Sequence, residues 1–118
     1  MKSFNELIDT EIILEFANIS PKDHKFGVDV KLHLMQPGKK LQHGPRMKIY
    51  RKGIQGDFSI SINDNPKVIG NWNNFVSKRE LNLLITNVKF YKESLLKFWN
   101  DSRMDTNELI NLMRNQDK

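Results

Sequence analysis

The clearest pattern in the chain is an alternation of apolar and polar residues over positions 26–34. Every second side chain there is phenylalanine, valine or leucine, and the residues between them are glycine, aspartate, lysine and histidine. A period of two is typical of a strand with one buried face and one face in water. The pattern therefore predicts a strand over these nine residues.

Two later segments repeat the alternation. In residues 46–50 the side chains of Met47 and Ile49 point one way, while two cations and a tyrosine point the other. Residues 57–62 alternate again, with three apolar side chains facing inward. A short turn over 53–56, with glycine at each end, joins these two segments. We therefore expect the three strands to form an antiparallel meander.

Weaker signals extend the sheet at both sides. Residues 11–19 are rich in β-branched and aromatic side chains, which favours another strand. Residues 67–69 fit a short edge strand, and the 3–6 segment has the spacing of a capping box that would open one helical turn. Between the strands and the main helix, Trp72 and Phe75 either cap the core or offer stacking surfaces beside the basic strand.

A long helix follows at about 78–100. Ser77 and Glu80 have capping-box spacing, and apolar residues then recur with the helical period as far as Trp99. We expect this stripe to cover the sheet. Asp105 and Glu108 open a short C-terminal helix in the same way.

Leu83 and Phe90 lie seven residues apart on the opposite side of the predicted long helix. They require a second cover, which is either the C-terminal helix or a partner protein. These elements predict one α+β domain over residues 1–118: an antiparallel sheet of four to five strands covered by one long helix, plus a short C-terminal helix.

Charge is concentrated in one segment. Residues 37–56 contain six lysines and arginines and no acidic residue, which accounts for more than the net charge of +5 of the whole chain. A local positive field attracts phosphates or acidic protein surfaces. The alternative is a solvated edge strand, because lysines on an edge also block unwanted strand pairing. The candidate binding residues are Lys39, Lys40, His43, Arg46, Lys48, Arg51 and Lys52.

Catalytic and metal-binding motifs are not evident in the sequence. The chain has no cysteine, and His24, His33 and His43 stand in separate segments without metal-ligand spacing. His33 fits a solvated strand histidine. His43 either stabilises the turn before Pro45, or meets a phosphate or acts as an acid or base. We expect no metal, no cofactor and a non-enzymatic protein.

The segment from His43 to about Asp101 contains five short features in order: His43-Gly-Pro45, the 58–62 strand, the 63–66 turn, Arg79-Glu-Leu81 and the 95–99 segment that ends in Trp99. In these features it resembles a family of short bacterial and phage-encoded proteins of unknown function, often encoded near toxin–antitoxin genes. The resemblance covers about half of the chain and implies a sheet covered by a helix, with no established activity. Family members often carry further histidines after the proline, whereas Arg46 and Lys48 stand here, which favours anion binding.

The sequence therefore predicts a small binding or regulatory protein, with an inhibitory role in a phage or mobile element as one form. Its basic strand and loop would dock an anionic partner: nucleic acid, a ribonucleoprotein or an acidic protein face. The alternatives are an antitoxin-like protein-binding module, and a small nuclease or phosphotransfer enzyme that uses His43. The acidic residues near the start and the lack of any run of 18 apolar residues favour a cytoplasmic location without a membrane contact.

Overall fold

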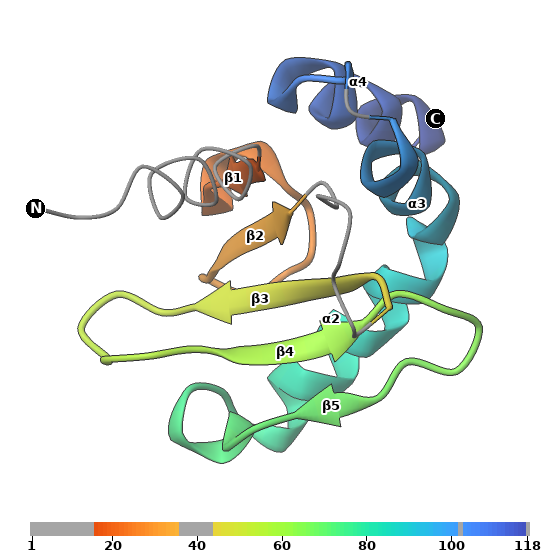
Figure 1. Ribbon diagram of the computed structural model, residues 1–118. Helices are drawn as coiled ribbons and strands as arrows, with labels where there is room; N and C mark the ends of the chain where they lie inside the picture. Colours follow the sequence, from red (N-terminus) through yellow and green to blue (C-terminus); the bar gives the residue numbers. More distant parts are fainter. Residues whose placement is uncertain (1–15, 36–43, 102, 118) are drawn as a thin grey trace, which may run out of the picture.

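The computed structural model describes residues 16–35, 44–101 and 103–117. It is an α+β fold in which five antiparallel strands form one sheet, and each strand pairs with the next one in the chain (Figure 1). The strands are β1 (Phe16–Ile19), β2 (Lys31–Met35), β3 (Arg46–Tyr50), β4 (Phe58–Ser61) and β5 (Val68–Ile69). The predicted meander is confirmed, and β5 is the expected edge strand.

The register fixes which side chains share a face. Ala17 lies opposite Leu34, Leu34 opposite Met47, and Met47 opposite Ile60, so one row of apolar side chains crosses four strands. All four of these side chains are fully buried. Because side chains alternate along a strand, the residues between them must project from the other face.

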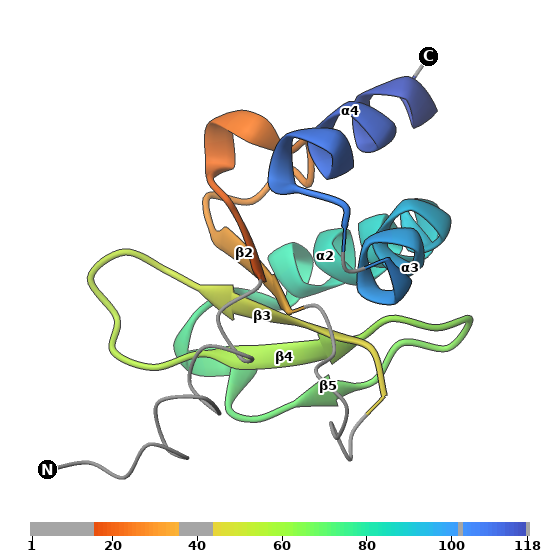
Figure 2. The same ribbon diagram turned by 45° about the horizontal axis from the view of Figure 1, so that its top comes forward.

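Helices cover the apolar face of this sheet. They are α2 (Lys78–Phe90), α3 (Lys92–Asn100) and α4 (Thr106–Gln116), and two short 3-10 turns precede them, η1 (Pro21–Asp23) and η2 (Trp72–Asn74). Figure 2 shows the helices on one side of the sheet, with α4 against α3. The capping boxes predicted at the starts of α2 and α4 form: Ser77 Oγ accepts from the Glu80 amide at 3.1 Å, and Asp105 Oδ1 accepts from the Glu108 amide at 2.8 Å.

The prediction of one long helix over 78–100 is wrong, because the helix breaks at Tyr91. The backbone of Tyr91 has φ −93° and ψ 9°, outside the helical range, and α3 restarts in a new direction. No proline or glycine marks this break. The Tyr91 ring is anchored by a tertiary contact, since it stacks on Phe26 with the ring centroids 5.3 Å apart and the planes 7° apart.

The predicted strand over 26–34 is shorter than expected. β2 begins only at Lys31, although the apolar residues at 26, 28 and 30 are buried as predicted. Two features bend the backbone before that point. Gly27 has a positive φ of 78°, and the buried ring of His24 binds two backbone groups, the amide of Phe26 and the carbonyl of Val30.

Two other predictions concern the ends of the sheet. The described part of the strand predicted over 11–19 is β1, and residues 11–15 and the 3–6 capping box lie outside the described residues. Phe75 is buried and its ring contacts that of Phe58, which confirms its role in the core, and Trp72 is half-buried against the core. In the described residues, no helix is long and apolar enough to cross a lipid bilayer.

Candidate functional site

The sheet face opposite the helices, here called the open face, is polar at its centre. None of the described helices lies on it (Figures 1 and 2). One cross-strand row follows from the register: Asn18 opposite His33, His33 opposite Lys48, Lys48 opposite Ser59, and Ser59 opposite Ile69. Tyr50 lies opposite Lys31, and Arg46 lies opposite Ser61.

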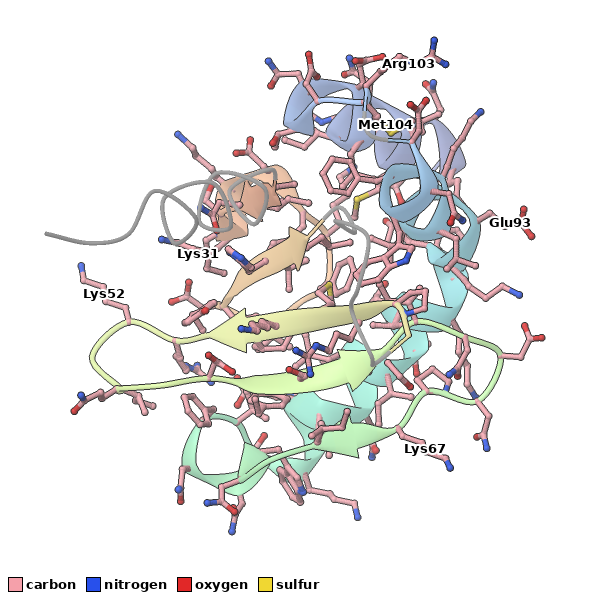
Figure 3. The ribbon with its side chains drawn as sticks, in the orientation of Figure 1. Lys31, Lys52, Lys67, Glu93, Arg103 and Met104 are labelled. Atoms are coloured by element: carbon pink, nitrogen blue, oxygen red, sulfur yellow. The ribbon has the colours of Figure 1, made fainter. Side chains whose placement is uncertain are left out.

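Four cations belong to this face or its margins. Arg46 and Lys48 are on the central strand β3, Lys31 begins β2, and Lys67 stands just before β5 (Figure 3). Among the described residues, the ion pairs of the protein take up none of these four side chains. None of the described acidic side chains therefore forms an ion pair with these four cations.

A group of polar contacts lies beside the cations. The His33 Nδ1–H donates to Asn18 Oδ1 at 2.7 Å, and the ring meets that of Tyr50 edge to face with centroids 5.7 Å apart. Tyr50 in turn hydrogen-bonds to Asp57 at the start of β4. These contacts hold both rings in fixed orientations on the sheet.

The protonation states follow from the surroundings of the two rings. Burial lowers the pKa of His33 below its ordinary value of 6.5, and Lys48 and Lys31 lower it further, against an opposing effect of Asp57. Burial and the Asp57 carboxylate raise the pKa of Tyr50 above 10. Near neutral pH, His33 is therefore uncharged and Tyr50 keeps its hydroxyl proton, so the charge of the open face comes from its lysines, its arginine and Asp57.

A depression of about 580 Å³ adjoins these rings at one end of the open face. It lies between the β1–β2 connection and the β3–β4 hairpin, and is lined by both polar and apolar groups, among them His33, Tyr50, Lys31, Lys52 and Ile54. Such a site is within the usual size range for small-molecule binding.

Arg51 lines the same depression as Lys31 and Lys52, and its guanidinium also makes contacts on the helix side of the sheet. Its guanidinium Nη1 donates to the Glu80 carboxylate at 3.0 Å and to the Phe75 carbonyl at 3.0 Å, which ties β3 to the first turn of α2. The arginine lowers the pKa of Glu80, with a further contribution from the Ser77 amide. Arg51 therefore makes a structural contact, and its role in binding stays a prediction, while Lys52 is exposed on the hairpin.

The remaining predicted binding residues are Lys39, Lys40 and His43, which lie outside the described residues. The structure thus brings two of the seven predicted residues, Arg46 and Lys48, to the centre of the open face. In the described part of the chain, no group of three or more histidines and acidic residues could hold a metal ion.

The two apolar residues expected to need a cover have different surroundings. Leu83 is half-buried against the core, near Gly27. Phe90 is 51% exposed, and Gln116 Nε2 of the C-terminal helix donates to its backbone carbonyl at 2.9 Å. About half of Phe90 thus stays uncovered by the described residues, and a partner contact there stays a prediction.

Sequence reasoning missed the His33, Asn18, Tyr50 and Asp57 contacts. His33 was expected to be a solvated strand histidine, yet it is partly buried in a network that spans β1 to β4. The available signal was the alternation itself, which puts His33 and Lys48 on outward positions of neighbouring strands. Only the register shows that they are opposite each other.

Comparison with known proteins adds no relative. No protein-family model matches the chain, and no curated protein or solved structure matches it either. The resemblance to the phage-associated family therefore stays a prediction.

Proposed function

We propose that this protein binds nucleic acid through the open face, with Arg46 and Lys48 as the central phosphate contacts. One observation carries the proposal: Lys31, Arg46, Lys48 and Lys67 share this face and its margins without an ion pair to any described residue. Phosphate contacts of this kind position a protein on nucleic acid and supply most of its non-specific affinity.

The positions of Asp57 and of the Arg51–Glu80 ion pair also support nucleic-acid binding at the open face. Asp57 is the acid beside the Tyr50 ring, and its carboxylate is engaged by the Tyr50 hydroxyl. The positive charge of Arg51 is balanced by Glu80 on the helix side of the sheet. Other described cations also lack ion pairs, but Lys31, Arg46, Lys48 and Lys67 gather on one face and its margins, where a polyanion would meet them together.

Nucleic acid is favoured over an acidic protein because the cations are spread along a wide sheet surface rather than clustered at one point. A nucleic acid presents phosphates at regular intervals over such a surface, whereas a protein partner would need an acidic side chain positioned opposite each cation. A regulatory or inhibitory role in a phage or mobile element, which would fit the size of the chain and the resemblance, would need only binding and no catalysis.

The test is a salt titration of binding to short labelled DNA and RNA. Each neutralised phosphate adds about 0.7 to the slope of log affinity against log salt on single strands and about 0.9 on duplex DNA. Four contacts therefore predict a slope of about −3 to −3.5. The double variant Arg46→Gln/Lys48→Gln should flatten the slope by about 1.5, because two contacts are lost.

A matched control is Lys78→Gln/Arg79→Gln, which removes the same charge from exposed positions at the start of α2, on the other side of the sheet. The control should keep the slope of the parent protein. Equal flattening by both double variants would show that net charge alone drives binding. No binding to any nucleic acid at about 50 mM salt, where counterion release favours the complex, would refute the proposal and leave an acidic protein surface as the partner.

A further inference from the structure

The depression at the end of the open face combines three kinds of surface. The aromatic rings of Tyr50 and His33 line it on the sheet side, and Ile54 adds apolar surface from the β3–β4 hairpin. Charged side chains line it as well: Lys31 at the start of β2 and Lys52 on the hairpin (Figure 3), together with Arg51 and one acid, Asp29. A site that binds only phosphate would not require aromatic and apolar side chains.

The Tyr50 ring is held in place before any ligand binds. Its hydroxyl is hydrogen-bonded to Asp57, and its ring meets His33 with the planes 75° apart. A ring that is already ordered loses little conformational entropy when another flat group packs on it. Aromatic side chains on a sheet surface are a common platform for the unstacked bases of single-stranded nucleic acid.

We infer that this depression receives one unpaired base of a single-stranded nucleic acid, packed on the Tyr50 ring, with Lys31 and Lys52 at the flanking phosphates. The inference rests on the proposed function, because the strand must first be held by the open face. It adds a preference that phosphate contacts alone do not give: the bases of a duplex are stacked inside the helix and cannot enter, so single strands bind more tightly.

The experiment compares one labelled oligonucleotide as a single strand and as a duplex, at one salt concentration. The single strand should bind more tightly to the parent protein. Tyr50→Ala should weaken single-strand binding by about 5-fold to 150-fold, the usual effect of losing one stacked base. It should leave the salt slope unchanged because no charge is removed, and Tyr50→Phe should keep most of the affinity because the ring stays.

Two further measurements keep the test decisive if Tyr50→Ala folds poorly. Ile54 is 37% exposed on the hairpin, so Ile54→Ser should fold normally and still weaken single-strand binding. A fluorescent base analogue, 2-aminopurine, placed in the oligonucleotide should change its emission on binding to the parent and to Tyr50→Phe, and respond less to Ile54→Ser.

The outcomes separate this inference from the proposed function. Equal affinity for single strand and duplex, or full affinity in both Tyr50→Ala and Ile54→Ser, would overturn the base site. The proposed function would survive that result if Arg46→Gln/Lys48→Gln still flattened the salt slope. Absence of all nucleic-acid binding would overturn both.

Discussion

Arg46 begins β3 and Arg51 directly follows it, and the two arginines have different surroundings. Arg51 joins Glu80 and the Phe75 carbonyl on the helix side, whereas Arg46 is on the open face. Replacement of each by glutamine removes one positive charge from nearly the same place in the sequence. We expect Arg51→Gln to lower stability and leave nucleic-acid binding intact, and Arg46→Gln to do the reverse.

The size of the stability loss follows from the surroundings of Arg51. The side chains of Arg51 and Glu80 are 27% and 28% exposed, so their ion pair is neither fully screened nor fully buried. A pair of this kind contributes about 1 kcal/mol, at the upper end of the range for exposed pairs. Loss of the donor to the partly buried Phe75 carbonyl adds about 1 kcal/mol. The total of about 2 kcal/mol corresponds to a fall in Tm of about 8 °C for a chain of this length.

Thermal unfolding and salt titration of the two variants provide the measurement. Arg46→Gln should melt within about 0.5 kcal/mol of the parent, as expected for a surface substitution, and should flatten the salt slope by about 0.7 to 0.9. The loss of folding stability at acidic pH provides a second measurement. Glu80 has a lowered pKa in the folded state, so its contribution is present above its ordinary pKa of 4.5 and is lost as pH falls below it. This loss of stability at acidic pH should therefore be smaller in Arg51→Gln than in the parent protein.

The reasoning would be refuted by an Arg51→Gln melt that matches the parent. It would also fail if Arg51→Gln flattened the salt slope as much as Arg46→Gln, because Arg51 would then be a phosphate contact. A double-mutant cycle with Glu80→Gln isolates the ion pair from the other effects of each substitution.

Two further predictions concern the core and its response to pH. Leu95 is fully buried where α3 packs on the core, so Leu95→Ala should cost about 2 to 4 kcal/mol in chemical unfolding, and a loss below about 1 kcal/mol would reject this packing. The ring of His24 accepts a hydrogen bond from the Phe26 amide, and burial lowers the pKa of this histidine. The folded state therefore binds fewer protons than the unfolded state, so stability should fall as pH drops below 6.5. The pKa of His33 is also lowered, so the loss of stability between pH 7 and 5 should be smaller in His24→Gln and smaller again with His33→Gln added. An unchanged pH dependence in the double variant would contradict this assignment.

Local chemistry allowed much of the fold to be predicted. The alternation over 46–50 and 57–62 marks strands because the period of two is a property of the backbone itself. The capping boxes of α2 and α4 were visible in the sequence, since the Ser77–Glu80 and Asp105–Glu108 hydrogen bonds form between residues three positions apart. The segregation of apolar and basic residues on β3 was likewise predictable, as was the placement of Arg46 and Lys48 on its polar side.

The features that the sequence did not reveal depend on contacts between distant residues. The helix breaks at Tyr91 because that ring is stacked on Phe26, 65 positions earlier, while the local sequence favours an unbroken helix. Arg51 was counted with the binding cations because nothing near it in the chain indicates that Glu80 lies within hydrogen-bond distance. The polar network of the open face needed the register, because a shift of one residue would have turned His33 or Lys48 to the opposite side. Periodicity thus determined which residues face outward, and only tertiary packing determined which of them meet and which remain available to a partner.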